Sequence, residues 1–542
     1  MRRFFELMLG DEPQGGGSRN WSLRALAFIG IFLAWWILTA VVYRHTQSNF
    51  LRAESGWYLF LSHSAPAPRH DFEKVLSRTS FRGHYTPFAF LAEFMTARLV
   101  GTNAGFWKWR QITVLAVLAT MVFLFVRKSG SGFRLSSIKA NLCAAGLTTV
   151  LIFQAQMRYF VAWPFMILQL FWLLCTVIAW MSLIQMVRRP AEKLWPWLAA
   201  GTAYASLHFI GLGLATVGAT AAALAGIWVG TRESASSSSP KVILPLLSMI
   251  ALTGLHTALA LRFYWKGDIP IAPAWQPTSF VVASLGFISN FALATARSLF
   301  SANLPTLNAE QIAQDWPYGL AILLGFGLLV SSAFFRVRRE PTAWNQTRFI
   351  LRTFASILFL TIIALTATRE GREPSPEGFA GYLTGSRHLI PGAFALAGVM
   401  SEFLFLLASG PILFAAFLNM TLAVCAITGN LHYVRHVYPE VTPNSMISHA
   451  HAWQSVLAMA RECRKANLPI PNVPLGALTQ EFDGWDLKLF EPLLRADLLV
   501  PPGTSLEFLA WPGFVNELPS EYSRDVPSLG EVRKKLRLKT KK

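Results

Sequence analysis

The residues best suited to chemistry gather in one polar stretch, residues 43–110, between the first and second apolar runs of the chain. Glu54, Asp71 and Glu73 lie in it, and such a carboxylate can accept a proton as a general base or pair with a neighbouring cation. The stretch also holds side chains that can pack against or hydrogen-bond a ligand, namely Trp57, Tyr58, His63, His84 and Tyr85. Because the chain after it is mostly apolar, we expect this stretch to serve chemistry or docking.

The composition places this stretch in a membrane protein. Hydrophobic residues make up 53% of the 542-residue chain and charged residues only 14%, with a mean hydropathy of +0.41, whereas soluble chains are about 25% charged. Apolar runs of about 18 residues or more recur, and each can cross a ~30 Å hydrocarbon layer as a helix. The sequence therefore predicts an all-α polytopic membrane protein.

The basic residues and the cysteines exclude other classes. The net charge is +19, but we expect no nucleic-acid partner, because many Lys and Arg residues lie in short loops between apolar runs. Cytoplasmic loops of membrane proteins retain such residues, and anionic lipid headgroups or phosphates are their natural partners. The cysteines, Cys143, Cys175, Cys425 and Cys463, are scattered. Their spacing indicates neither a metal site nor a disulfide framework.

Three parts are expected along the chain. Residues 1–22 form a cytoplasmic lead, residues 23–428 a membrane domain of about eleven spans, and residues 429–542 a small outer C-terminal domain with a basic tail. The expected spans are 23–43, 108–126, 140–158, 161–187, two within 195–229, 242–263, 317–335, 349–367, 389–408 and 410–427. Alternation of sides puts the loops that hold two or more basic residues on one side, which predicts a cytoplasmic N-terminus and an outer C-terminus.

Helices that lie at the membrane surface are expected outside these spans. The first outer loop, 44–107, contains two short amphipathic segments, 71–77 and 87–100. The second begins at a proline, which the first turn of a helix tolerates. An interfacial or re-entrant helix is also expected at 280–299.

Two segments resemble a known family. The chain reads RAESGWYLFL from Arg52, then HDFEKVLSRTSFRGHYTPFAFLAEFMTARLVGTNAGFWKWRQITVLAVLATMVFLFVRK to Lys128. This is similar to the first outer loop and second span of GT-C fold glycosyltransferases, most nearly the relatives of protein O-mannosyltransferases. There an acidic motif follows the first span, and an aromatic-x-Pro step comes later. The segment GYLTGSRHLIPGAFALAGVM, residues 381–400, resembles the Arg-containing start of a late span in that family. The likeness covers about residues 1–430.

The resemblance implies an inverting transferase that moves a sugar from a polyprenyl-phosphate carrier to a hydroxyl of a protein or glycolipid at the outer face. Glu54 stands at the acidic motif and would be the general base. Arg387 and His388 would bind the departing phosphate, with Arg158 and Arg297 as further phosphate ligands. The pocket for sugar and acceptor would include His84, Tyr85, Trp57 and Asp71.

Each of these roles has an ordinary alternative. Glu54 would otherwise be a solvated loop carboxylate, and Arg387 an anchor that snorkels to the interface. His84 and Tyr85 would otherwise anchor a helix at the membrane surface. Many members of the family carry a second acidic residue after the third span, where this chain has Gln154, Gln156 and Arg158. We therefore expect transfer without a metal ion or other cofactor.

Two other functions stay open. A transporter or flippase of a lipid-linked substrate is one, although transporters often contain two matching halves and none is apparent here. A GT-C-like assembly subunit without activity is the other.

Glu402 lies within an expected span and must have a partner there, either in a buried hydrogen bond or on an ion path. His208 and His256 are expected to be packing residues. The expected location is the bacterial inner membrane.

Overall fold

A computed structural model describes the membrane domain. The described residues are 19–44, 46, 86–100, 104–133, 135–231, 242–264, 277–300, 310, 314–370 and 386–432. Within these ranges all regular elements are helices. The segment 71–77 and the C-terminal domain 429–542, apart from its first four residues, lie outside the described residues.

Nine helices of the described ranges are long and apolar enough to cross a membrane. They are α2 (Arg19–Val42), α6 (Ala104–Gly132), α9 (Ile167–Arg188), α11 (Gly213–Thr231), α12 (Ile243–Tyr264), α15 (Trp316–Arg339), α16 (Ala343–Glu370), α18 (Ser386–Ala408) and α19 (Ile412–His432). Each corresponds to an expected span. The chain is therefore an all-α polytopic membrane protein, as the composition predicts.

The other two expected spans have a different form. The expected span 140–158 is α7 (Ser137–Ile152), followed by η1 (Ala155–Met157) and α8 (Arg158–Ala162) after a bend of 57°. The first half of the run 195–229 is α10 (Leu194–Ser206), whose 13 residues cover only about 20 Å as a helix. A helix of that length is too short to cross a ~30 Å hydrocarbon layer alone.

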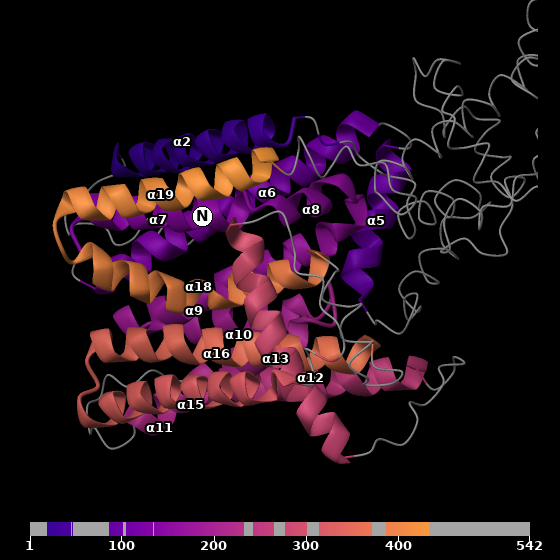
Figure 1. Cartoon of the computed structure of the whole chain (residues 1–542), viewed down its shortest axis with the longest axis vertical. Helices are drawn as coiled ribbons and strands as arrows, with labels where there is room; N and C mark the ends of the chain where they lie inside the picture. The colour runs from indigo at the N-terminus through magenta and orange to yellow at the C-terminus, as the bar shows by residue number, and fades with distance from the viewer. Residues whose placement is uncertain are drawn as a thin grey trace, which may run out of the picture.

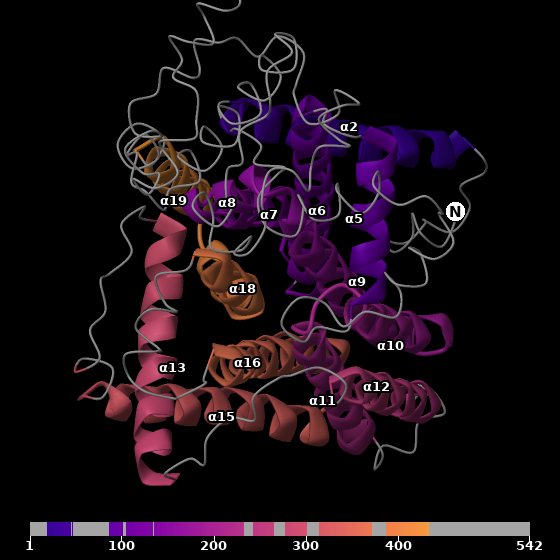
Figure 2. The same cartoon turned by 90° about the vertical axis from the view of Figure 1, so that its right-hand side faces the viewer.

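Two further helices cross the bundle rather than run along it. These are α5 (Pro87–Val100) and α13 (Pro277–Phe300), which match the expected surface helices 87–100 and 280–299. Figure 1 shows α13 nearly perpendicular to α16 and α18. In Figure 2, where α16 and α18 are seen almost end-on, both α5 and α13 run vertically. We call this end of the molecule the crossing-helix end.

Basic side chains mark the opposite end, which we call the basic end. Arg188 at the end of α9 donates a hydrogen bond to the backbone carbonyl of Lys128 near the end of α6. Lys139, at the start of α7, donates to the carbonyl of Gly410 over 2.6 Å. That contact places the uncharged turn between α18 and α19 among the basic loops. Cations near helix C-termini are favourable because the helix dipole is negative there.

The core lies between the helices in the middle of the bundle. The Trp180 ring of α9 packs between Phe125 of α6 and Phe354 of α16, with ring centroids 4.7 and 4.6 Å away. Gly398 lets α18 approach this stack, because a Cβ there would overlap the Trp180 ring. In contrast, α2, α12, α15 and α19 leave most of their apolar surface uncovered. Such faces suit contact with lipid chains, which are as apolar as the side chains.

Candidate functional site

Several sequence-predicted site residues lie outside the described residues: Glu54, Trp57, Asp71, His84 and Tyr85. The residues on either side of this segment are described. Thr46 follows α2, and Thr86 directly precedes α5, which lies across the crossing-helix end. The chain therefore enters and leaves the segment that carries Glu54 at that end of the bundle.

Arg158 lies where the chain enters this segment. Its guanidinium donates to Thr46 Oγ1 at 2.8 Å, to Asn430 Oδ1 at 3.0 Å and to the carbonyl of Val42 at 3.2 Å. It also lies over the Tyr43 ring, 5.4 Å from the centroid. The side chain is only 2% exposed. These contacts tie Arg158 to the ends of α2 and α19, so the guanidinium has a structural task whether or not it also binds a phosphate.

The surroundings of Arg158 account for its burial. The C-terminal ends of α2, α7 and α19 meet there, and each carries a partial negative charge of about 0.5. Tyr43 Oη donates to the carbonyl of Ile152 at 2.7 Å, and Asn430 Nδ2 to that of Phe153 at 2.9 Å. The bend after α7 exposes these carbonyls, and the two donors satisfy them. Burial raises the pKa of the Tyr43 hydroxyl, so the hydroxyl keeps its proton and remains a hydrogen-bond donor to the Ile152 carbonyl.

The remaining predicted cations lie on helices that reach the same end. Ser298 of α13 donates to Gln154 at the bend over 3.5 Å, and the neighbouring Arg297 is exposed. A Cβ on Gly392 of α18 would come within 2.6 Å of the Phe291 ring of α13. The absence of a side chain at Gly392 therefore lets α13 pack closely against α18. Arg387 and His388 lie in the first turn of α18. Their side chains are outside the described part of the chain.

An ion pair fastens the crossing helix α5 to the bundle. The Glu93 carboxylate of α5 is fully buried and lies 2.8 Å from Nη2 of Arg110 on α6. Arg110 also donates to the carbonyl of Pro164 over 2.9 Å. Burial raises the pKa of Glu93, and the Arg110 charge opposes that shift. This pair was not predicted from the sequence. The signal for it was an acidic residue on an apolar helix, which requires a partner, and Arg110 is the basic residue just inside the next span.

The first turn of α5 rests on the turn between α10 and α11. The backbone amides of Phe88 and Ala89 both donate to the carbonyl of His208, at 3.1 and 3.2 Å. The first amides of a helix have no partner within it, and this carbonyl supplies one. The Phe88 ring stacks on the His208 ring with centroids 4.6 Å apart. His208 is a packing residue in this arrangement, as the sequence analysis expects.

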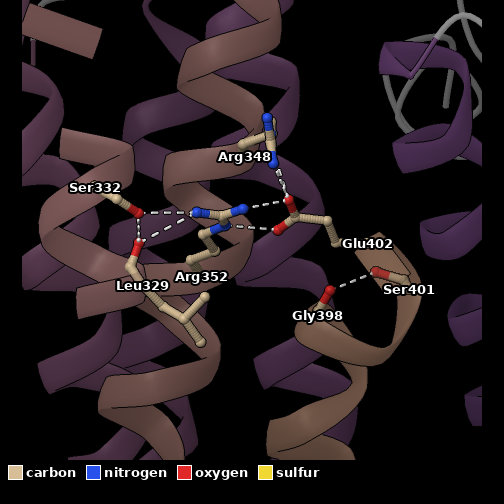
Figure 3. Close-up of polar contacts among 7 residues, drawn as sticks. All are labelled: Leu329, Ser332, Arg348, Arg352, Gly398, Ser401 and Glu402. Carbon is tan, nitrogen blue, oxygen red and sulfur yellow. Dashed lines mark hydrogen bonds and ion pairs between the residues drawn. The ribbon is translucent and has the colours of Figure 1, made fainter. Parts of the chain in front are cut away.

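Glu402 has two partners, both on α16. Its carboxylate accepts hydrogen bonds from Arg348 and Arg352 (Figure 3). The charge of Glu402 predicts a partner within the span, but neither arginine was identified from the sequence. The available signal was the spacing: Arg348 and Arg352 are four residues apart at the start of an apolar helix and so share one face.

Within the described ranges, these observations define the class of the protein as an all-α polytopic membrane protein in which two helices, α5 and α13, cross one end of the bundle. Comparisons of the chain with protein-family models, with curated proteins and with solved structures find no match in any of the three.

Proposed function

We propose that the protein is a GT-C-type glycosyltransferase that moves a sugar from a polyprenyl-phosphate donor to a hydroxyl of a protein or glycolipid. The transfer takes place at the crossing-helix end. One observation carries the proposal: the segment with Glu54 starts beside Arg158 and returns at α5, at the end where α18 begins with Arg387. This topology allows an acidic residue and a cation to meet at one membrane surface.

The chemistry assigns a task to each group. Glu54 takes the proton of the acceptor hydroxyl as its oxygen forms a bond to the anomeric carbon. The bond between that carbon and the phosphate oxygen breaks, and the phosphate leaves with the bonding electrons from the opposite face. Arg387 and His388 stabilise the charge that grows on the phosphate, with Arg297 nearby. Arg158 holds Thr46, where the chain enters the segment.

The crossing helices suit a donor that keeps its tail in the bilayer. On α5, the large side chains Phe88, Met95 and Leu99 are exposed, at 47%, 43% and 78%, and their spacing puts them on one face. The other face buries Ala89, Glu93 and Ala97. A helix with this division lies in the plane of the interface, with its apolar face toward the acyl chains. It would leave the donor phosphate at the surface.

The charge distribution supports an orientation for this reaction. The turns of the basic end carry basic clusters: Arg127 and Lys128, Arg188 and Arg189, and Arg336, Arg338 and Arg339. Short loops of this kind are retained in the cytoplasm. The crossing-helix end then faces outward, which for a bacterial inner membrane is the periplasm.

The test has two steps. Mass spectrometry of lipids that co-purify with the protein would identify a prenyl-phosphate sugar, and that lipid is then the donor in a transfer assay in vesicles. The Glu54→Gln variant should lose transfer by about 100-fold or more, which is the usual contribution of a general base. Glu192→Gln is the matched control, because Glu192 pairs with Arg189 at the basic end, and it should keep full transfer. Full transfer by Glu54→Gln would exclude that residue as the base.

A further inference from the structure

An ion cluster with more positive than negative charge lies near the basic end. Arg352 donates Nε to Glu402 Oε2 at 2.8 Å and Nη2 to Oε1 at 2.7 Å, a bidentate pair. Arg348 donates Nε to the same Oε1 at 2.8 Å, and its Nη2 lies 2.7 Å from that oxygen. Two guanidinium groups therefore share the single carboxylate of Glu402, and one positive charge is left over. Figure 3 shows Arg348 and Arg352 on the same side of the carboxylate, and Arg352 reaching Ser332 of α15.

The cluster continues onto the exposed face of α15. Arg352 donates to Ser332 Oγ at 3.1 Å, and Asn345 Nδ2 donates to the carbonyl of Glu340 at 2.9 Å, so α15 and α16 run antiparallel. Arg336 is four residues after Ser332, and Arg348 is four residues before Arg352. In this register Arg336 and Arg348 lie at the same level on neighbouring helices. Arg336 is exposed.

The surroundings are those of a membrane interface. Next to Arg336, the side chains of Leu328 and Phe335 on α15 are 71% and 58% exposed, so this helix faces lipid chains. Arg348 lies over the Trp344 ring, 5.4 Å from its centroid, and tryptophan is typical of the headgroup level. The ionisable residues of this region in the described chain are Arg336, Arg338, Arg339, Arg348, Arg352, Glu340 and Glu402. Guanidinium groups outnumber carboxylates, which favours an anionic ligand.

We propose that Arg336 and Arg348, supported by the Arg352–Glu402 pair, bind the headgroup phosphate of an anionic phospholipid. The acyl chains of this lipid lie along the exposed face of α15. Glu402 keeps Arg348 and Arg352 in place and leaves donors of Arg348 for the phosphate, while Arg336 approaches it from α15. This lipid site lies at the opposite end of the bundle from the proposed transfer reaction and does not depend on it.

The test uses the full chain, purified in detergent with phosphatidylcholine and then titrated with phosphatidylglycerol. Native mass spectrometry measures how much phosphatidylglycerol each variant retains. Arg336→Gln should retain it about fivefold more weakly, the usual effect of one basic residue at an anionic surface. Arg338→Gln is the matched control, because it removes the same charge from another face of the same helix turn. It should retain the lipid as the native protein does.

Two results would overturn the proposal. Equal retention by Arg336→Gln and Arg338→Gln would show that general surface charge, and not this site, binds the lipid. Complete displacement of phosphatidylglycerol by millimolar inorganic phosphate would assign the site to a soluble anion. Arg336 is exposed and takes no part in the ion pairs of Glu402 with Arg348 and Arg352, so Arg336→Gln should fold normally. A second variant, Arg348→Gln, should weaken retention at least as much.

Discussion

Two groups of cations in the described part of the chain are stabilised in different ways. Arg158 has hydrogen bonds to neutral groups and lies where three helix C-termini meet, so the partial charges of the helix ends oppose its positive charge. Arg348 and Arg352 instead share the carboxylate of Glu402, whose side chain is 6% exposed. A buried charge requires such compensation because it has lost its water. Both arrangements join helices that are far apart in the sequence.

The Glu402→Gln variant tests the second arrangement. It leaves Arg348 and Arg352 facing each other without the carboxylate, and breaking a buried pair in this way costs about 3 kcal/mol or more. We expect a clear fall in the thermal transition of the detergent-purified protein, followed by tryptophan fluorescence. The double variant Glu402→Met with Arg352→Met should lose less than the two single changes together. Native-like stability of Glu402→Gln would contradict a stabilising role for the ion pairs of Glu402. If that stable variant also lost substrate flux, the result would favour a transporter.

At the scale of elements, α5 is held at two points. Its first amides bond to the His208 carbonyl in the turn between α10 and α11, and Glu93 one and a half turns later pairs with Arg110 of α6. A helix of 14 residues is only marginally stable in isolation. These two attachments therefore fix the position at which the segment with Glu54 returns to the bundle.

The first attachment predicts a dependence on pH. Burial, reinforced by the nearby His256, lowers the pKa of His208 to about 4; the other neighbours from the packed elements, Tyr204 and Phe88, carry no charge at neutral pH. Between about pH 6.5 and 4 the unfolded chain binds a proton that folded His208 does not, so stability falls as the pH falls through this window. Because His208 is only half-buried, we expect about 1 kcal/mol rather than the full effect of the shift.

Thermal transitions at pH 7.5 and pH 5.0 check this expectation. The native protein should have the lower transition at pH 5.0, and His208→Gln should show a smaller difference between the two values. His432→Gln is the control, because His432 is exposed at the end of α19, and it should behave as the native protein does. An unchanged pH difference in His208→Gln would mean that other groups cause it.

The sequence predicts some elements well and others poorly, for physical reasons. Apolar runs locate the long helices but not their ends, since α6 and α16 extend beyond the expected spans 108–126 and 349–367. The expected helices 87–100 and 280–299 are close to α5 and α13. The bend after α7 was missed because it depends on Tyr43 and Asn430, which come from distant parts of the chain. The partner of Glu402 was required by its charge, but its identity depends on how α16 packs against α18. The roles of Glu54 and Arg387 stay predictions.

At the scale of the whole molecule, the two ends differ in kind. The basic end closes with short, positively charged turns and holds the Glu402 cluster, whereas the crossing-helix end carries α5, α13 and both ends of the segment with Glu54 (Figures 1 and 2). Donor transfer at one surface and lipid binding at the other require that these ends face opposite sides of the membrane. From the positive-inside rule we expect the basic end to face the cytoplasm.

Single cysteines would test this orientation in intact cells. With the native cysteines replaced, Ala296→Cys on the exposed face of α13 and Glu340→Cys in the turn after α15 are both accessible positions. An impermeant maleimide should label Ala296→Cys from outside, and should label Glu340→Cys only after the cells are opened, because the basic turn is held inside. The reverse pattern would put Arg387 and the segment with Glu54 in the cytoplasm. Transfer at an outer surface would then be excluded, whereas the lipid site beside Glu402 would stand.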